Sequence, residues 1–161
     1  AAIVDLCRPD QRTGIPLHVH SLIMSKLIEL LKRQEGLRLH PYEDNGDQSI
    51  GYGRNLTSVG LTEQECEALL RNDVTRVEGE VRSSYPYFEG LSENRQIAVL
   101  SLAYNLGQTR HAKFINHHQA MAEGDFVRAA EEIYPGSLYA TQVPDRAREI
   151  ADIIADDTLE L

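Results

Sequence analysis

The chain has 161 residues, 42% of them hydrophobic, and a formal net charge of −9 from 16 Lys and Arg against 25 Asp and Glu. Its length suits one domain or two small lobes that share a core. Its acidity argues against a nucleic-acid partner, which would need a basic surface. No apolar run reaches the roughly 18 residues that a membrane span requires, so stable membrane insertion is not expected.

The first 23 residues are expected to form a leader segment of uncertain order. Residues 1–16 contain Pro9, Gly14 and Pro16 and show no sustained periodicity. The apolar stretch that follows lacks the basic start and the small-residue cleavage site of a signal peptide. We therefore expect a helix there, with apolar positions at helical spacing from Val19 onward, that ends at Gly36.

Residues 37–57 have the character of a small sheet. Apolar and polar residues alternate at first, and Asn45-Gly46 is a strong hairpin signal. Residues 49–53 then form a returning strand that contains Gly51 and Gly53. Glycine weakens a strand, so these two indicate a sharp turn or a close approach of another group.

The remainder of the chain is predicted to be helical. Thr62 and Glu65 form a capping box at the start of a long helix that ends at Tyr85-Pro86. Ser92 can cap the next helix, which Gly107 closes. Further helices are expected over residues 114–122, 125–134 and 144–155, with Pro144 in the first turn of the last one and Val143 as a weak cap. The expected inward-facing positions of the two long helices are Leu70, Val74, Val77 and Val81, and then Ile97, Leu100 and Tyr104.

Together these elements predict a mainly helical α+β fold. A small sheet lobe, about residues 36–60, is joined by a long helix, about 62–83, to a helical lobe, about 84–161. The first helix is expected to pack with the helical lobe, so residues 24–161 form the principal domain. A cleft between two such lobes is a natural ligand site.

The cysteine and histidine residues give weak signals. Cys7 and Cys66 make no disulfide framework and no zinc spacing. Cys66 is at helical spacing from apolar residues, so a buried free thiol is the first expectation and a Cys7–Cys66 disulfide the alternative. His18-x-His20 is a poor metal motif without further ligands, and His117-His118 is interpreted as helix surface. No metal is predicted.

Two carboxylates, Glu35 and Asp44, stand on either side of a short extended segment. Glu35 ends an apolar helical pattern, whereas Asp44 lies in a polar turn. If both face one cleft, different surroundings can keep one carboxyl protonated and the other ionised. Such a pair is what glycosidic bond cleavage requires. With 25 acidic residues in the chain, solvated surface groups are the competing interpretation.

The order of these residues resembles the phage lysozymes of glycoside hydrolase family 24, of which the lysozyme of the T-even phages is the best-known member. The likeness begins with Glu35-Gly36, Asp44 and Ser49-Ile-Gly-Tyr-Gly53, and extends over about residues 25–155. Further blocks that are similar to the family are LTEQECEALLRNDV (61–74), LSENRQIAVLSLAYNLGQTRHAKF (91–114) and VPDRAREI (143–150).

The resemblance implies hydrolysis of the β-1,4 bond between N-acetylmuramic acid and N-acetylglucosamine in bacterial peptidoglycan. Glu35 then matches the general acid and Asp44 the second carboxylate. Ser49 stands where the family usually has Thr, whose hydroxyl helps to hold the attacking water. The implied mechanism inverts the anomeric centre, which needs roughly 6.5–9.5 Å between the two carboxyl groups. No cofactor is implied.

The resemblance also assigns supporting residues. Arg146 matches an arginine that approaches and orients the acid, and Arg54 and Asp73 match an ion pair between the sheet and the long helix. The substrate-binding positions carried over from the family are Gly53, Asn55, Tyr104, Asn105, Gly107, His117 and Glu132. Asn55, His117 and Glu132 depart from the residues of the best-known member, so the outer subsites are less well supported than the catalytic pair.

The implied protein is an endolysin-type muramidase that acts as a monomer. Without an export signal, it is expected to accumulate in the host cytoplasm before it reaches the cell wall. Two other interpretations stay open: a peptidoglycan-binding protein with weak or lost catalysis, and a helical interaction domain unrelated to glycans.

Overall fold

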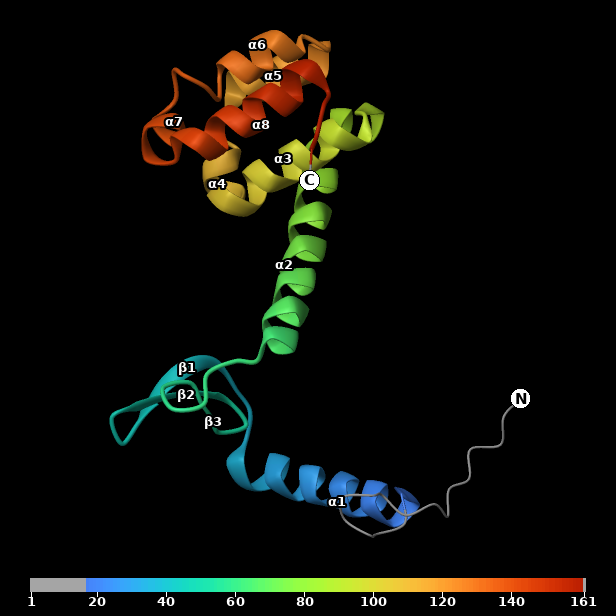
Figure 1. Ribbon diagram of the computed structural model, residues 1–161, viewed down its shortest axis with the longest axis vertical. Helices are drawn as coiled ribbons and strands as arrows, with labels where there is room; N and C mark the ends of the chain where they lie inside the picture. Colours follow the sequence, from blue (N-terminus) through green and yellow to red (C-terminus); the bar gives the residue numbers. More distant parts are fainter. Residues whose placement is uncertain (1–16, 161) are drawn as a thin grey trace, which may run out of the picture. The chain divides into compact units, whose positions relative to one another are not determined.

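The computed structural model describes the backbone of residues 17–160 and the side chains of residues 21–160. The chain divides into two compact units, residues 1–63 and 64–161, here called the sheet unit and the helical unit. The predicted fold class is confirmed, because most of the described residues are helical and a small antiparallel sheet accompanies the helices (Figure 1). Residues 1–16, most of the expected leader segment, lie outside the described residues.

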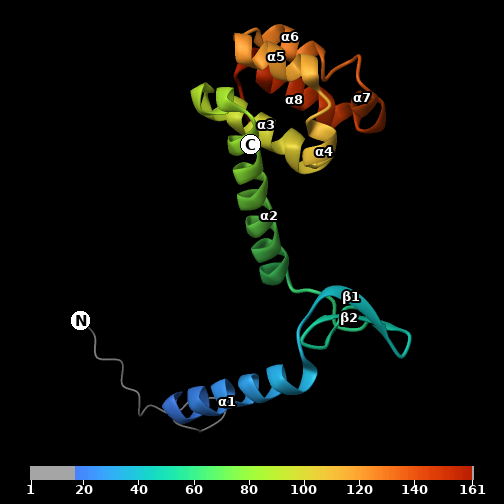
Figure 2. The same cartoon turned by 180° about the vertical axis from the view of Figure 1, so that it is seen from behind.

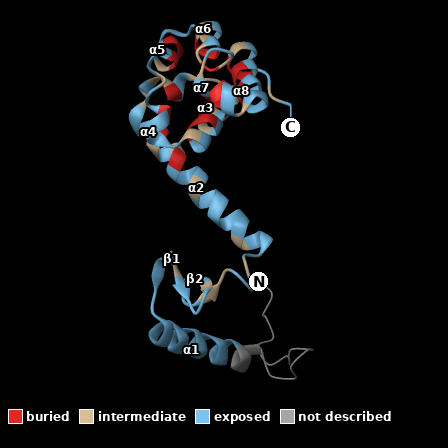
Figure 3. Cartoon of the chain, turned by 90° about the vertical axis from the view of Figure 1, so that its left-hand side faces the viewer, coloured by how far each residue is buried: buried red, intermediate tan, exposed pale blue. Residues whose placement is uncertain are grey.

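The sheet unit opens with helix α1 (Leu17–Glu35), which starts inside the expected leader segment. It ends where predicted, at Gly36, whose φ is +68° and whose N–H donates to the Lys32 carbonyl at 3.1 Å. From Ser21 to Glu35 every residue of α1 is exposed (Figure 3). Glu35 is thus the last residue of α1, and the helix termination at Gly36 places it directly before the sheet.

Three antiparallel strands follow α1 in the order β1-β2-β3 (Figure 1). They are β1 (Arg38–Asp44), β2 (Asp47–Gly51) and β3 (Arg54–Asn55). Asn45 and Gly46 join β1 to β2 with φ values of 51° and 90°. Two consecutive positive φ angles are the requirement of a type I′ hairpin turn, so this prediction from the Asn-Gly pair is confirmed.

The helical unit contains the remaining elements, which Figures 1 and 2 show from opposite sides. Ser92 caps α3 by accepting from the Arg95 N–H, and Val143 provides no side-chain cap for α8, both as predicted. The short helices α4 and α7 and the 3₁₀ turn were not predicted. The bounds are α2 (Glu63–Ser84), the 3₁₀ turn η1 (Pro86–Gly90), α3 (Glu93–Leu106), α4 (Gln108–His111), α5 (Ile115–Glu123), α6 (Phe126–Glu131), α7 (Leu138–Gln142) and α8 (Pro144–Asp156).

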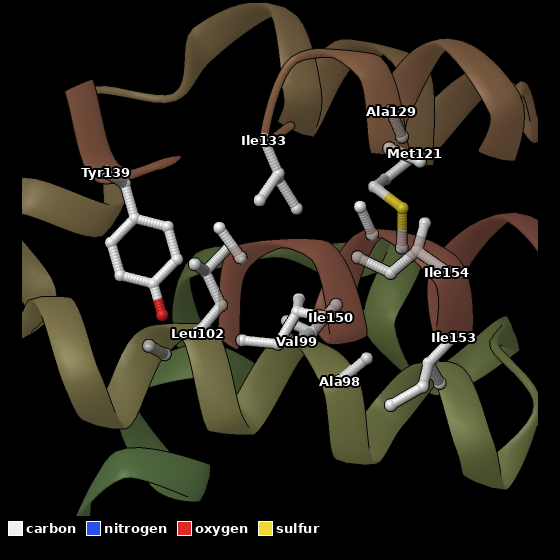
Figure 4. Packing of buried hydrophobic residues seen from close by; sticks show 14 of the residues in the cluster. Ala98, Val99, Leu102, Met121, Ala129, Ile133, Tyr139, Ile150, Ile153 and Ile154 are labelled. Carbon is white, nitrogen blue, oxygen red and sulfur yellow. The ribbon is translucent and has the colours of Figure 1, made fainter. Parts of the chain in front are cut away.

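Helix α8 is the centre of the helical unit, since it packs against α3, α6 and α7 (Figures 1 and 2). Figure 4 shows Ile150 of α8 beside Val99 and near Leu102 of α3, with Ile154 farther along α8 in the same cluster. All four side chains are essentially inaccessible to solvent. Burying a side chain of this size contributes about 1.5–3 kcal/mol, so this cluster is the main source of stability in the unit.

The predicted inward face of α3 is wrong at two of its three positions, since only Leu100 packs against the core, where it is partly buried. Within the helical unit Ile97 and Tyr104 are exposed, while the buried positions are Ala98, Val99, Leu102 and Ala103. Helix α3 is apolar over much of its circumference, so periodicity alone does not identify the face that packs on α8. The same holds for α2, where Val77 and Val81 are buried but Leu70 and Val74 are exposed.

A polar network fastens the start of α3 to the end of α8. The Arg95 guanidinium donates to the Ile154 carbonyl at 2.8 Å and pairs with Asp157 at 3.1 Å. It also lies 3.8 Å from the centre of the Phe126 ring. Because Arg95 is mostly buried, these partners compensate the cost of removing its charge from water.

Cys66 is exposed on α2 and is a free thiol, so the prediction of a buried thiol is wrong. Its alternative partner, Cys7, lies outside the described residues. None of the helices within residues 17–160 is long and apolar enough to cross a bilayer.

Candidate functional site

The carboxyl group of Glu35 lies directly against Gly53. A Cβ atom placed on Gly53 would be 3.2 Å from Glu35 Oε2, and Gly53 has a φ of +78°. The position therefore requires glycine for two reasons, a backbone conformation that other residues rarely adopt and the space taken by the carboxyl group. This contact explains the glycine that the sequence placed in a strand, and it joins the end of α1 to the turn between β2 and β3.

Asp44 and Ser49 share one face of the sheet. In the strand register Asp44 is opposite Asp47, and Ser49 is opposite both Tyr42 and Asn55. Residues directly opposite one another project to the same side, and so do residues two apart in one strand. Asp44 is thus a diagonal neighbour of Ser49, at the end of the hairpin. Asp44 is exposed, whereas Ser49 is only 4% exposed.

Asn55 is held by hydrogen bonds within the sheet unit. Its Nδ2 donates to Asp47 Oδ2 at 2.7 Å, and its Oδ1 accepts from the Ser58 N–H at 2.8 Å. The Gln48 N–H also donates to Thr57 Oγ1 at 2.9 Å. Sequence reasoning missed the supporting role of Asp47, although an acid directly after the Asn-Gly turn was a signal for it. The network fixes the strand that carries Ser49.

The sheet unit contains five of the sequence-predicted site residues, with Glu35 against Gly53 and Asp44 on the same sheet face as Ser49 and Asn55. Glu35 and Asp44 are exposed carboxylates, and Ser49 supplies a buried hydroxyl. A carboxyl at a helix end, a second carboxylate at a hairpin and a hydroxyl on the middle strand can supply an acid, a base and a hydrogen bond to water. Among the described residues no group of His, Cys, Asp and Glu could hold a metal ion. The five residues are Glu35, Asp44, Ser49, Gly53 and Asn55.

The other predicted site residues belong to the helical unit. Tyr104 and Asn105 are exposed at the end of α3, directly before Gly107, which has a φ of 71°. Glu132 accepts from Asn116 Nδ2, at 3.3 Å from each carboxylate oxygen. Arg146 is exposed on α8. Substrate contacts at these positions stay predictions.

Two contacts predicted from the resemblance would each pair a residue of the sheet unit with a residue of the helical unit. The Arg146–Glu35 contact stays a prediction, and so does the Arg54–Asp73 pair. Within its own helix Asp73 pairs with Arg76 at 3.1 Å, and Arg54 Nε donates to the Gly60 carbonyl at 2.9 Å.

The interpretation of His117 as helix surface is wrong. His117 is fully buried, and its Nδ1 lies 2.9 Å from the Ala129 carbonyl oxygen. A carbonyl only accepts, so Nδ1 carries the proton and Nε2 is left buried without a partner among the described residues. The burial lowers the pKa of His117 to about 4 and leaves no surface for substrate contact. Sequence could not show this, because burial depends on the position of α6.

His117 belongs to an aromatic cluster with His111, which is also buried, and with His118, Tyr85 and Tyr87, which are partly buried. The His118 ring stacks on Tyr85 with 4.0 Å between centroids, its Nδ1 accepts from the Tyr87 hydroxyl at 2.8 Å, and its Nε2 donates to the His111 carbonyl at 2.9 Å. Burial, with smaller contributions from the two other imidazoles, lowers the pKa of His111 to about 3. The cluster is thus built from neutral imidazoles and has a structural role.

The fold and the sheet site define a class of protein, a mainly helical α+β protein that presents a helix-end carboxyl against a glycine of a small sheet. The family model described as phage lysozyme matches residues 32–139, a segment that includes Glu35, Asp44, Ser49 and Gly53. The chain belongs to the phage lysozyme family. Arg146 lies beyond the matched segment, so its role depends on the resemblance alone.

Several relatives have similar sequences. An endolysin of Acyrthosiphon pisum secondary endosymbiont phage 1 is 35% identical over 92 residues, which cover 54% of this chain and 61% of the relative. The pre-baseplate central spike protein Gp5 of Enterobacteria phage T4 is 26% identical over 181 residues, covering 94% of this chain and 31% of the relative. A probable T4-type lysozyme 2 of Dictyostelium discoideum is 23% identical over 168 residues, covering 86% and 98%.

The chain thus spans about three fifths of the endolysin and about a third of the spike protein, but nearly all of the Dictyostelium relative.

Proposed function

We propose that the protein is an endolysin-type muramidase that hydrolyses the β-1,4 bond between N-acetylmuramic acid and N-acetylglucosamine in bacterial peptidoglycan. One observation carries the proposal: the segment that matches the phage lysozyme family contains Glu35, Asp44 and Ser49, and all three belong to the same small unit. The Glu35 carboxyl lies against Gly53, and Asp44 and Ser49 share a sheet face.

Glu35 is proposed as the general acid. Its proton passes to the glycosidic oxygen as the C1–O bond breaks, so the leaving sugar departs as a neutral alcohol. The Gly53 contact limits where the carboxyl can move, which keeps the acid in one place relative to the sheet. A fixed acid matters because catalysis falls steeply when a reacting group is misplaced.

Asp44 is proposed as the general base. It accepts a proton from a water molecule while the water oxygen forms a bond to C1 from the side opposite the leaving group. Ser49 offers its hydroxyl to the same water from the neighbouring strand. After one turnover Asp44 holds a proton, Glu35 is ionised, and exchange with solvent resets both groups. A single displacement of this kind inverts the anomeric configuration.

The decisive experiment compares the parent with a Glu35→Gln variant on purified peptidoglycan and measures the reducing ends released. We expect the substitution to lower the rate by about 10²–10⁴-fold, the usual contribution of a positioned acid. Since Glu35 is exposed, the free energy of unfolding should change by less than about 0.5 kcal/mol.

A Glu43→Gln variant is the matched control, because Glu43 is an exposed carboxylate on the same strand as Asp44. It should retain the parent rate. A parent that binds peptidoglycan but releases no reducing ends would overturn the proposal in favour of a glycan-binding role.

A further inference from the structure

The end of α1 carries a lysine on the same face as the proposed acid. Lys32 precedes Glu35 by three residues, and residues three apart on a helix are neighbours on its surface. Lys32 nonetheless bonds to Glu29, because its Nζ donates to Glu29 Oε1 at 2.9 Å. The lysine thus has a carboxylate three residues away on each side, and it pairs with the earlier one.

Helix geometry explains why Lys32 pairs with Glu29. A glutamate that precedes a lysine is the better order for an ion pair on a helix, since it agrees with the helix dipole. The hydrogen bond and the charge of Glu29 raise the pKa of Lys32, and Tyr52 of the β2–β3 turn acts on it more weakly. The Glu35 carboxyl lies against Gly53 of the same turn. The two carboxylates of α1 therefore have different partners.

The partner of Lys32 matters for an acid that must deliver a proton. A general acid works only while it is protonated, and a cation beside a carboxyl favours the ionised form. A Lys32 ammonium that turned to Glu35 would therefore oppose the proposed role of that residue. An exposed ion pair of ordinary strength displaces an ionisation by about 0.2–0.7 pH units.

Other charged groups around Glu35 are the same in all the variants compared below. In the sheet, Arg38 lies 4.2 Å from the centre of the Tyr42 ring, and Arg54 Nε donates to the Gly60 carbonyl at 2.9 Å. These groups include Arg33 of α1, Arg38, Asp44 and Arg54 of the sheet, and Arg146, which the resemblance assigns to the acid.

We infer that Glu29 is a positioning residue for the proposed reaction, because it holds the Lys32 ammonium away from Glu35 and so allows the acid to keep its proton until it is delivered. The inference rests on the proposed function and adds a residue that acts on it through another side chain. Glu29 precedes Glu35 by six residues, about 9 Å along the helix axis, so it is not itself a catalytic residue.

The test is a cycle of three variants, Glu29→Gln, Lys32→Gln and the double variant, each assayed across pH for reducing ends released from purified peptidoglycan. The alkaline limb of the pH–rate profile reports loss of the proton from the general acid. Glu29→Gln should move this limb to lower pH by about 0.2–0.7 units, because Lys32 then keeps Glu35 as its carboxylate at helical spacing. In the Lys32→Gln background the same substitution should move the limb by less than half as much, because no ammonium is left to release.

Glu78→Gln is the matched control. It removes the carboxylate of another helical ion pair, in which Glu78 lies 2.8 Å from Arg82 on α2, and it should leave the alkaline limb in place. An unmoved limb in Glu29→Gln would overturn the inference. So would an equal displacement with and without Lys32, since that would be a general effect of charge and not the release of an ammonium group.

Carbon-13 NMR of the Glu35 carboxyl follows its ionisation without any turnover, which distinguishes this inference from the proposed function. The titration curve of Glu35 should move to lower pH in Glu29→Gln and less in the double variant. A protein that cleaves peptidoglycan but keeps the parent curve in Glu29→Gln would overturn this inference alone. A curve that moves as expected in a protein that releases no reducing ends would overturn the proposed function alone.

Discussion

The sheet unit and the helical unit are stabilised in different ways. In the sheet unit the only buried residue among those described is polar, Ser49, and hydrogen bonds of Asn55 and the hairpin hold the strands. In the helical unit a continuous apolar cluster surrounds α8 (Figures 3 and 4). Figure 3 shows that the buried residues gather almost wholly in the helices that follow α2.

This difference suggests that the helical unit supplies most of the stability and that the sheet unit supplies the proposed catalytic groups. Apolar burial scales with area and gives most of the folding free energy. A small polar sheet contributes less to stability, but it can place charged groups at a solvent boundary without burying them. The catalytic candidates belong to the unit with almost no core, so substitutions in the two units should affect different observables.

The largest stability effect is expected from Leu102→Ala in the helical unit. Leu102 is fully buried between α3 and α8, and such truncations cost about 2–5 kcal/mol. Urea unfolding measures the loss. Ile115→Ala is the control, because Ile115 is 70% exposed in the same unit and should cost less than about 0.5 kcal/mol. Equal losses in the two variants would mean that the α3–α8 cluster is not the stabilising core.

The buried imidazoles should make the helical unit sensitive to acid. The folded-state pKa of His117 is about 4 and that of His111 about 3, below the ordinary value of 6.5, because burial disfavours the charged ring. The unfolded chain therefore binds protons first. The free energy of unfolding is therefore highest above pH 6.5. Below that pH each group lowers it by up to about 1.4 kcal/mol per pH unit, down to about pH 4 for His117 and about pH 3 for His111.

Unfolding free energies at pH 7, 6 and 5 measure this slope. A His117→Gln variant should show a slope smaller by about 1.4 kcal/mol per pH unit between pH 6 and 5. His40→Gln, at an exposed position of β1, should leave the slope unchanged. If the His117 variant kept the parent slope, the burial of a neutral ring at this position would be refuted.

A smaller stability effect is expected in the sheet unit from Gly53→Ala. The substitution strains a backbone with φ of +78° and pushes on Glu35 Oε2 at 3.2 Å. We expect a stability loss of about 1–2 kcal/mol and an activity loss of about tenfold or more, because the acid moves.

A Gly51→Ala variant distinguishes the effect of backbone strain from the effect of the contact with Glu35. Gly51 has a φ of +68°, but a Cβ there meets no atom within 4 Å. It should lose a similar free energy of unfolding and keep more of the activity. If both variants lost activity equally, the Glu35–Gly53 contact would have no special part in catalysis.

Sequence could predict the parts of the fold that local chemistry determines. Gly36 ends α1 and Asn45-Gly46 turns the hairpin, because few other residues adopt these backbone angles. The Ser92 cap and the Pro144 start of α8 are equally local. The candidate site residues of the sheet unit were also predicted, but from the family resemblance and not from local chemistry.

The features that sequence missed depend on tertiary packing. The buried face of α3 is selected by α8, and the burial of His117 depends on the Ala129 carbonyl of α6. The exposure of Cys66 was missed because helical spacing from apolar residues does not say which face of α2 is covered.

The pairing of Glu35 as acid with Asp44 as base is the central claim, and product stereochemistry tests it most directly. Proton NMR of a peptidoglycan glycan during the first minutes of reaction would record the anomer at the new N-acetylmuramic acid reducing end. A single displacement by water predicts the α-anomer first, and no product from Glu35→Gln on the same timescale. The β-anomer first, or an active Glu35→Gln variant, would contradict the account.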